Sequence, residues 1–546
     1  MQQPRVTEET ILVPDTPVVV AASDPEEKRW GWYQFPSIRK DAAGRIIVGF
    51  NVTEDSIRSY GKGGVKTFAS SDSGKTWDPI EALTHNDMPA DVSNDRFGLE
   101  FGVLLPNGDR IAVSETEAVP VSDIDFPEPV GWLPSGYDGA CAPAPVYRLK
   151  DLPGEWQGFP LKRLAKGAKE WTTEFATIDD PYDLRSPVEG LFHITVVGRF
   201  RVAHDGSVIA CVYPGAYMRD DGSIAPRNSV LFWRSTDYGR TWRFWSRLTC
   251  EPDPATDELG ELHRVFGEPY MEILHDGSFY CVVRTTDGLG VGPLYAARST
   301  DMGRTWSKPV AIAPNGVEPQ LLKLANNTLI LSAGRPGVQV RVSPDGLGRE
   351  WSPPLHLVQQ EMMEVTSDTC GYTKLLATGP DTFMVVYSDF RRKDDNGCER
   401  KSILVCEIQV KRVARPAKAD SPEHAAPAAE QEVLRYYHDR AGGALAVEIP
   451  MVDGRAHGVM KKYYCDGAIA MEVPMRHGIE HGIKKFYYRT GQLWQEVEFR
   501  KGWKHGIERF YDRAGFLTTE RYYLDWQECS KGAFLAAGRQ PPSLPA

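Results

Sequence analysis

Short apolar runs separated by turn residues recur between residues 35 and 387 of the chain. In six segments, one apolar run leads into a turn with Gly, Asn or Pro, and a second apolar run follows. This arrangement is typical of a β-hairpin, because those residues adopt the backbone angles of a tight turn. The six predicted hairpins are FPSIRKDAAGRIIVGF (35–50), FGVLLPNGDRIAV (101–113), VVGRFRVAHDGSVIACV (196–212), EPYMEILHDGSFYCVVR (268–284), EPQLLKLANNTLILSA (318–333) and YTKLLATGPDTFMVVY (372–387).

Further strand-like runs, such as SVLFWRS and LYAARS, lie between these hairpins. The hairpin turns are roughly 50 to 100 residues apart, which leaves room for two more strands after each hairpin. Six units of four strands predict an all-β fold, namely a six-bladed β-propeller. One or two β-sandwiches are the alternative, and the six-fold count argues against them. The strand-like ILVPDTPVVV at 11–20 is expected to complete the last blade and close the ring.

A second repeat, with a period of 24 residues, begins after a segment rich in Ala, Pro and charge. It reads HGVMKKYY from 457, HGIKKFYY from 481 and HGIERFYD from 505, with a looser copy from 433. Each unit predicts one hairpin, and such hairpins stack because one alone cannot bury its face. We therefore expect a propeller over 1–412, a flexible linker over 413–431, a small repeat sheet over 432–530 and a tail over 531–546.

Charge and composition exclude several classes of protein. The net charge is −11 and no Lys/Arg-rich run occurs, which argues against a nucleic-acid partner. No apolar run approaches the ~20 residues of a membrane span. The N-terminal MQQPRVTEET lacks the features of a secretory signal, so the cytoplasm is favoured. The nine cysteines include no CxxC pair, and we expect reduced thiols, no metal site and no cofactor.

The string RSTDMGRTW at 298–306 nearly repeats RSTDYGRTW at 234–242, and SSDSGKTW at 70–77 is a third copy. A degenerate fourth copy, SPDGLGREW, occupies 343–351. Ser and Asp side chains bond backbone N–H groups within a turn, Gly allows a positive φ, and Trp packs back on the sheet. These strings therefore predict turns between the third and fourth strands of their units. A site built from the start of the first strand and the end of the second would lie on the opposite face, because antiparallel strands alternate in direction.

Polar residues occupy that opposite face where a buried strand should be apolar. Innermost strands line the central channel of a propeller, so these side chains are expected to converge on one mouth. A Tyr, two acids and two Arg in one concave place form a candidate site, and channel-lining groups satisfied by water and by each other are the alternative. The positions before the six hairpin turns are Gln34, Leu99, Val197, Glu268, Glu318 and Tyr372, and those after them are Asn51, Glu115, Tyr213, Arg284, Arg335 and Ser388.

The repeated strings match the Asp boxes of the sialidase-type (BNR-repeat) β-propeller family, and the resemblance covers roughly residues 10–412. Sialidases use a Tyr nucleophile activated by a Glu, an Asp acid/base and three Arg that grip the substrate carboxylate. A neutral Tyr suits an anomeric carbon that already bears a carboxylate, because an anionic nucleophile would be repelled. The resemblance implies that Tyr372 in CGYTKLL is the nucleophile and Glu268 in GEPYM its partner. It likewise implies that Arg284 in VVRT and Arg335 in AGRPG bind the substrate.

Two departures from the family pattern concern the substrate carboxylate and the acid/base. The family's first Arg lies in a Tyr-Arg-Ile-Pro string, which here is WYQFPS, so Gln34 stands in its place without a charge. The acid/base is expected in NVTEDSIRSYGKGG, where Glu54 and Asp55 are available and Asp55 is chosen. Arg58 is close enough in sequence to supply the missing charge. The alternative is that Arg58 faces solvent.

Glu272 is a weaker alternative to Glu268 and is expected to point outward from its strand. The later repeats are similar to the MORN-variant (antitoxin YwqK-like) repeat family, which implies an interaction module for a protein partner. Their paired aromatics are interpreted as packing across the sheet.

Two functions remain open at this point. The first is a retaining exo-glycosidase acting on a terminal acidic sugar, sialic acid or a related one. The second is a catalytically inactive propeller that binds carbohydrate or protein.

Overall fold

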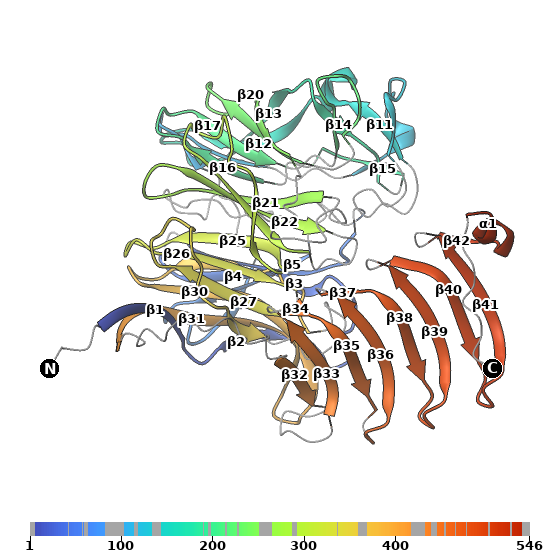
Figure 1. Ribbon diagram of the computed structural model, residues 1–546. Coiled ribbons are helices and arrows are strands. Elements are labelled where there is room, and N and C mark those ends of the chain that lie inside the picture. Colours follow the sequence, from blue (N-terminus) through green and yellow to red (C-terminus); the bar gives the residue numbers. More distant parts are fainter. Residues whose placement is uncertain are drawn as a thin grey trace. The chain divides into compact units, whose positions relative to one another are not determined.

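The computed structural model describes most of the chain and divides it into two compact units, Met1–Ala417 and Lys418–Ala546. Both units are built almost entirely from β-strands (Figure 1). The finer boundaries expected at 412, 431 and 530 stay a prediction. The described residues are 6–41, 43–56, 58, 64–81, 103–113, 118–133, 144–188, 190–194, 198–212, 216–225, 229–249, 265–286, 292–335, 337–358, 368–416, 432–437, 445–452, 455–464, 466–476, 478–500, 503–524 and 527–537.

Three sheets of the first unit each consist of four consecutive antiparallel strands. Their orders are β3-β4-β5-β6, β21-β22-β23-β24 and β25-β26-β27-β28. The strands are β3 Trp32–Lys40, β4 Ile46–Val52, β5 Val65–Ser70, β6 Asp78–Ile80, β21 Val265–Ile273, β22 Phe279–Thr286, β23 Leu294–Ser299, β24 Val310–Ala313, β25 Val317–Lys323, β26 Leu329–Gly334, β27 Val338–Ser343 and β28 Leu355–Val358.

A fourth sheet joins the two ends of the first unit. Its order is β29-β30-β31-β1, and β2 also pairs with β31, so the segment around 11–20 pairs with the last sheet as predicted. By pairing with β31, the N-terminal strands satisfy backbone groups that would otherwise be exposed at the edge of the sheet. The strands are β1 Val6–Pro14, β2 Val18–Ala22, β29 Lys374–Ala377, β30 Thr382–Lys393 and β31 Glu399–Pro416.

Two further groups of four strands form one eight-stranded sheet. The order is β16-β17-β19-β20-β13-β12-β8-β7, and the parallel pair of β13 with β20 joins the two groups. All six predicted hairpins are present as antiparallel pairs, while the number of propeller blades stays a prediction. The strands are β7 Val103–Leu104, β8 Arg110–Val113, β12 Gly158–Leu164, β13 Thr172–Asp179, β16 Gly198–Val202, β17 Val208–Val212, β19 Val230–Ser235 and β20 Thr241–Leu248.

The segment after β8 holds small sheets that the sequence pattern did not predict. One has the order β10-β11-β14-β18 and another pairs β9 with β15. Strands of only two to five residues give too few periods for an alternation of apolar and polar positions to be recognised. The elements are β9 Val119–Pro120, β10 Gly131–Leu133, β11 Ala144–Arg148, β14 Asp183–Arg185, β15 Leu191–Phe192, β18 Ala216–Tyr217 and 3-10 helices at Val121–Asp123, Leu149–Asp151 and Gly154–Trp156.

The repeated SxDxGxTW strings form turns with one shared pattern of hydrogen bonds. In the copy at 70–77, Gly74 N donates to Ser70 Oγ over 2.8 Å and Thr76 N donates to Asp72 Oδ1 over 2.9 Å. The bond from the Thr76 backbone N–H lowers the pKa of the Asp72 carboxyl to about 2. The copies at 234–242 and 298–306 repeat both bonds, and all three connect the third strand of their group to the fourth, as predicted.

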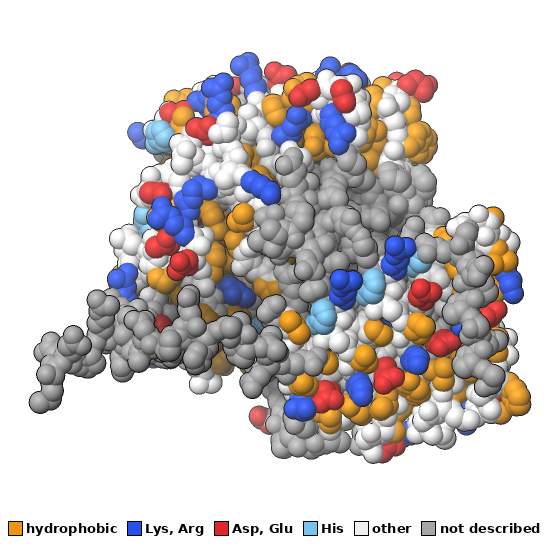
Figure 2. All heavy atoms as spheres, viewed as in Figure 1, with side chains coloured by type: hydrophobic (Ala, Val, Ile, Leu, Met, Phe, Trp, Pro, Cys, Tyr) orange, Lys and Arg blue, Asp and Glu red, His pale blue; other side chains and the backbone are white. Residues whose placement is uncertain are grey.

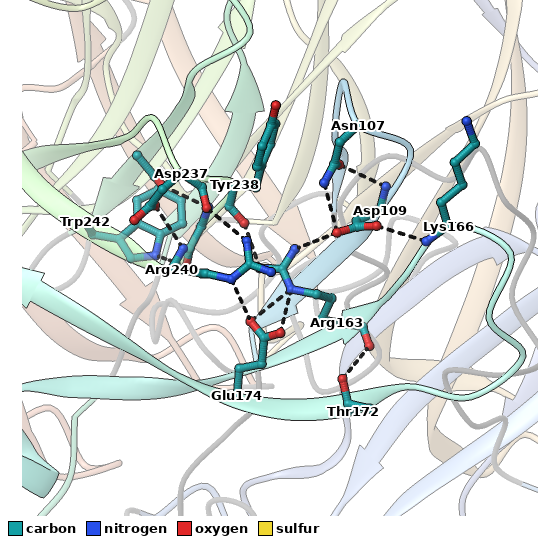
Figure 3. Close-up of polar contacts among 12 residues, drawn as sticks. Asn107, Asp109, Arg163, Lys166, Thr172, Glu174, Asp237, Tyr238, Arg240 and Trp242 are labelled. Carbon is teal, nitrogen blue, oxygen red and sulfur yellow. Dashed lines mark hydrogen bonds and ion pairs between the residues drawn. The ribbon is translucent and has the colours of Figure 1, made fainter.

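A buried arginine anchors one of these turns to the neighbouring group of strands (Figure 3). Arg163 on β12 is 3% exposed, and its Nη2 donates to the backbone oxygen of Tyr238 in the turn over 2.7 Å. Its Nε lies 2.9 Å from both carboxylate oxygens of Glu174, and its Nη1 lies 3.3 Å from Asp109 Oδ2. The turn at 234–242 is therefore bonded to the neighbouring group of strands.

The second unit is an antiparallel sheet whose hairpins follow the 24-residue repeat. Tyr487 OH donates to Glu472 Oε2 over 2.7 Å, and Tyr511 OH makes the same bond to Glu496 Oε1 over 2.9 Å. Basic, acidic and apolar side chains mix on the face of this sheet seen in Figure 2. The role of an interaction module stays a prediction. The elements are β32 Glu432–Tyr437, β33 Leu445–Val452, β34 Arg455–Ala456, β35 Gly458–Tyr463, β36 Ile469–Arg476, β37 Ile479–Glu480, β38 Gly482–Tyr487, β39 Leu493–Arg500, β40 Trp503–Tyr511, β41 Leu517–Leu524, β42 Gln527–Cys529 and α1 Lys531–Ala536.

Within the described ranges, the chain has no helix with the length and apolar character needed to cross a membrane.

Candidate active site

Tyr372 and Glu268, which lie in different sheets, are joined by a hydrogen bond. The Tyr372 hydroxyl donates to Glu268 Oε1 in a short contact. Glu268 is 6% exposed and Tyr372 is half-buried. A phenol that donates to a carboxylate is placed to lose its proton to that carboxylate. The two residues proposed from the sequence as nucleophile and base are therefore in contact.

A β-bulge turns the Glu268 side chain toward Tyr372. The register between β21 and β22 shifts between Gly267 and Tyr270, and Glu268 has a φ of 42°. Bulges re-aim side chains, and a non-glycine residue in the left-handed region is strained. Arg284 on β22 completes the local group, because its Nη1 lies 2.8 Å from Glu268 Oε1. Glu268 Oε1 thus receives both the phenol and a guanidinium.

The next hairpin repeats this local conformation and supplies a third bond to Glu268. Glu318 has a φ of 44°, and the register of its strand pair shifts between Val317 and Gln320. Its backbone N–H donates to Glu268 Oε2 over 2.8 Å. Its carboxylate is buried and lies 3.0 Å from Lys374 Nζ. Both oxygens of Glu268 are therefore held, which fixes the orientation of the carboxylate.

Arg335 lies against the ring of Tyr372. Its guanidinium carbon is 5.5 Å from the centre of the Tyr372 ring and 5.5 Å from that of Trp30. Its Nε donates to the backbone oxygen of Cys370 over 2.9 Å. Its terminal nitrogens make no hydrogen bond to a residue in the described ranges, and a guanidinium can bind a carboxylate through two parallel bonds.

Glycines allow the Arg335 and Tyr372 segments to approach each other. A Cβ on Gly334 would lie 2.1 Å from the backbone oxygen of Gly371. Ser388 fixes the same segment, because its Oγ accepts a bond from Cys370 N over 3.2 Å. The position of Tyr372 is therefore set by backbone contacts on both sides.

Gln34 is completely buried on β3, with an exposed fraction of 0%. Its amide Nε2 and Oε1 have no hydrogen-bond partner in the described part of the chain. The following residue, Phe35, has a φ of 51° and packs edge-on against Tyr372 with 5.1 Å between ring centres. Gln34 is therefore adjacent in sequence to the site and is uncharged, as the sequence implied.

Asp55 is exposed and bonded to an aromatic residue of the site. Its Oδ2 accepts a hydrogen bond from Trp30 Nε1 over 2.8 Å. Trp30 in turn lies under Arg335, so Asp55 is linked to the site through two side chains. Glu54 and Arg58 are also exposed.

Glu272, the alternative base, belongs to another ion pair. Its Oε2 lies 2.8 Å from Arg201 Nη2, and its Oε1 lies 3.9 Å from Lys323 Nζ. Its side chain is 14% exposed, and its outward direction stays a prediction.

Sequence reasoning missed Lys374, Trp30 and Phe35 as members of the site. Lys374 lies two residues after Tyr372, and such a spacing places two side chains on the same face of an extended segment. That signal was available for Lys374, whereas the aromatic residues had no comparable pattern. Four positions taken from the hairpin count lie outside the described residues: Leu99, Glu115, Val197 and Tyr213.

The charged groups around Tyr372 are equal in number when Asp55 is included. Arg284, Arg335 and Lys374 are basic, and Glu268, Glu318 and Asp55 are acidic. Since Arg284 is paired with Glu268 and Lys374 with Glu318, Arg335 is the cation of this group best placed to bind an anionic ligand. No group of three or more His, Cys, Asp or Glu side chains in the described ranges is placed to hold a metal ion.

Solved structures similar to this chain are distant from it. One is a protein of unknown function from Dyadobacter fermentans, with 18% identity, a TM-score of 0.46 and coverage of 73% of this chain and 99% of that one. An α-L-arabinanase from Penicillium chrysogenum complexed with arabinobiose has 15% identity, a TM-score of 0.37 and coverage of 72% and 98%. A mutant of NanB sialidase from Streptococcus pneumoniae has 12% identity, a TM-score of 0.37 and coverage of 72% and 70%.

No protein-family model and no curated protein matches the chain.

Proposed function

We propose that the protein is a retaining exo-glycosidase that removes a terminal acidic sugar, sialic acid or a related one, through Tyr372 and Glu268. The observation that carries this proposal is the hydrogen bond from the Tyr372 hydroxyl to Glu268. Tyr has an unperturbed pKa near 10, so it needs an adjacent base to act as a nucleophile at neutral pH. Glu268 is such a base, held in place through both of its oxygens.

In the first half of the reaction, Glu268 accepts the phenolic proton while the Tyr372 oxygen attacks the anomeric carbon. The bond from that carbon to the leaving oxygen breaks, and an acid, proposed to be Asp55, protonates the leaving alcohol. In the second half, Asp55 removes a proton from water, which attacks the same carbon and releases Tyr372. Glu268 returns its proton to the phenol. Two displacements at one carbon retain its configuration.

An acidic sugar suits the charges of the site. Arg284 and Arg335 are the proposed contacts for the substrate carboxylate, and Gln34 is the third. Because Gln34 brings no charge, one charge-assisted bond of roughly 1.5–3 kcal/mol is missing relative to a three-arginine site. This favours a broader range of acidic sugars over strict selection of sialic acid.

The test is a panel of aryl glycosides of acidic and neutral sugars, assayed with the wild type and with Tyr372→Phe. We expect turnover of an acidic glycoside and its loss in Tyr372→Phe, which keeps the ring but removes the hydroxyl. Tyr238→Phe serves as the comparison variant, because it removes the hydroxyl of an exposed tyrosine in the turn at 234–242 and leaves every residue of the proposed site unchanged. Unchanged turnover in Tyr372→Phe would show that this mechanism is wrong.

A second candidate function is a non-catalytic carbohydrate-binding propeller. It is favoured by the exposed position of Asp55 and its bond to Trp30, which leave the proton donor of the first reaction step outside direct contact with Tyr372. A wild-type chain that hydrolyses nothing in the panel but binds acidic glycans would support this function over the first.

A further inference from the structure

A groove lies between the outer strand of the β21–β24 sheet and the turn that follows β27 in the next sheet. It has a volume of about 510 Å³, within the range of roughly 300–1,000 Å³ typical of small-molecule sites. Its polar lining includes Arg298, Ser307, Arg341 and Arg349, and none of its lining residues is acidic. The groove is separate from the Tyr372 site, since the two share no residue.

The preceding junction of the same kind is closed. There, Trp245 Nε1 donates to the backbone oxygen of Met302 over 3.0 Å, and Trp306 Nε1 donates to Ser246 Oγ over 3.2 Å. Trp245 and Ser246 lie three and four residues after the last Trp of their repeated string. The junction is thereby filled by one aromatic ring and one hydroxyl.

At the groove, the two residues that would fill the space are replaced. Pro309 and Val310 lie three and four residues after Trp306, where Trp245 and Ser246 lie after Trp242. Val310 is 44% exposed and offers no acceptor to Trp351, the Trp of the fourth repeated string. Trp351 Nε1 is buried beside the Tyr280 hydroxyl, at a geometry that falls short of a hydrogen bond in the described ranges. The residues at these two positions therefore distinguish the groove from the filled junction.

Arg341 adds an uncompensated charge. Its terminal nitrogens donate to the backbone oxygen of Ser352 and to Gln339 Oε1, each over 3.2 Å, and both acceptors are neutral. Its Nε is buried and has no hydrogen-bond partner among the described residues. Burial lowers the pKa of Arg341. The partly buried guanidinium of Arg341 has only neutral acceptors, and an anion in the groove would stabilise its charge.

Two more cations border the groove. Arg298 lies 3.7 Å from Asp276 and above the Tyr280 ring, and it bonds the backbone oxygen of Leu347. Arg349 is exposed, and together with Arg298 it lowers the pKa of the Asp276 carboxyl. The floor between the cations is apolar and includes Ala296, Ala311 and Ile312. The groove thus offers donors and positive charge beside an apolar surface, and it has the size of a sugar.

We infer that this groove is a second binding site, which takes a monosaccharide-sized anion with an apolar face, an acidic sugar carrying a carboxylate. The inference that the ligand is an acidic sugar rests on the proposed function, whereas the inference that the ligand is an anion rests on the groove alone. The carboxylate binds Arg341 and Arg349, and the ring packs on the apolar floor beside Trp351. A glycan with several acidic ends could occupy this site and the Tyr372 site on separate branches.

The test is calorimetric titration with D-glucuronate, N-acetylneuraminate, galactose and inorganic phosphate. It uses a background in which Arg284→Met and Arg335→Met remove the cations of the Tyr372 site. We expect one site for a sugar acid to remain, with no binding of galactose. Adding Arg349→Gln should weaken this binding about tenfold or more, because a charged contact is lost. Arg304→Gln is the matched control, since Arg304 occupies the same place in the preceding string and should leave binding unchanged.

A second variant tests the groove without removing charge. Val310→Trp should fill the space as Trp245 fills the preceding junction, and it should abolish sugar-acid binding while the thermal unfolding temperature is kept. Absence of any anion binding in the Arg284→Met, Arg335→Met background would overturn the inference. Phosphate binding as tight as sugar-acid binding would overturn the assignment to a sugar. Failure of the proposed function gives a different result: the wild-type chain hydrolyses no glycoside but still binds anions in the groove.

Discussion

Lys374 Nζ lies 3.0 Å from Glu318 Oε1, and the two side chains are only 4% and 1% exposed. Lys374 follows Tyr372 by two residues, and the backbone N–H of Glu318 bonds Glu268. The ion pair therefore connects the segment of the proposed nucleophile to the strand that orients the proposed base. Gln320 Nε2 donates to the same Glu318 oxygen over 3.1 Å.

Replacing Lys374 with Met should destabilise the protein strongly. The variant leaves the Glu318 carboxylate buried without its cation, and breaking such a buried pair costs about 3–5 kcal/mol. The double variant Lys374→Met, Glu318→Met should recover most of the lost free energy of unfolding, because it removes both charges. Denaturant unfolding of the wild type, of Lys374→Met and of the double variant measures the three free energies of unfolding.

Arg243 provides a matched comparison for this experiment. Arg243 and Asp179 lie 3.8 Å apart, but their side chains are 73% and 75% exposed. Arg243→Met should therefore change the free energy of unfolding by less than about 0.5 kcal/mol. A loss in Lys374→Met no greater than that in Arg243→Met would contradict the importance of the buried pair.

Gln34→Leu should stabilise the fold and weaken the binding of substrate. The amide is completely buried and has no hydrogen-bond partner in the described ranges, so its desolvation is not compensated without a ligand. Replacing it with an apolar side chain of similar size should raise the free energy of unfolding by about 1 kcal/mol. If the amide contacts the substrate, KM for an acidic glycoside should rise in the same variant. A lower unfolding free energy would show that the amide is satisfied in the folded protein.

The six hairpins could be predicted from the sequence because each is set by local alternation and by its own turn residues. Glu268, Arg284, Arg335 and Tyr372 could be proposed as one site because hairpin position placed them at one mouth of the channel and the resemblance to sialidases singled them out. The pairing of Lys374 with Glu318 could not be predicted, because it depends on how two different sheets are shifted relative to each other. The bond from Trp30 to Asp55 depends on a loop conformation, which no periodic pattern encodes. Short strands such as β9 and β15 were missed for the related reason that two residues show no period.

Gly334→Ala should disrupt the approach of Arg335 to Tyr372. The new Cβ would lie 2.1 Å from the backbone oxygen of Gly371, so the two segments would have to separate. We expect a lower unfolding temperature and loss of any turnover that depends on Tyr372, since a displacement of about 1 Å can cost about 100-fold in rate. Gly154→Ala is the control, because a Cβ on Gly154 meets nothing within 4 Å. Equal effects of the two substitutions would show that the close approach is not needed.

Acid should weaken the first unit through His193. Burial, and then the charge of Arg185, lowers the pKa of His193 to about 4 in the folded protein, whereas an unfolded His titrates near 6.5. The unfolded state therefore binds the proton first, so the stabilisation is complete above pH 6.5 and is lost as the pH falls toward 4. Between pH 7 and pH 5 the free energy of unfolding should fall by roughly 1–2 kcal/mol from this residue. Denaturant unfolding of the wild type and of His193→Gln at several pH values measures the contribution, and the variant should show the shallower dependence. Equal slopes in the two proteins over this range would assign the acid sensitivity to other groups.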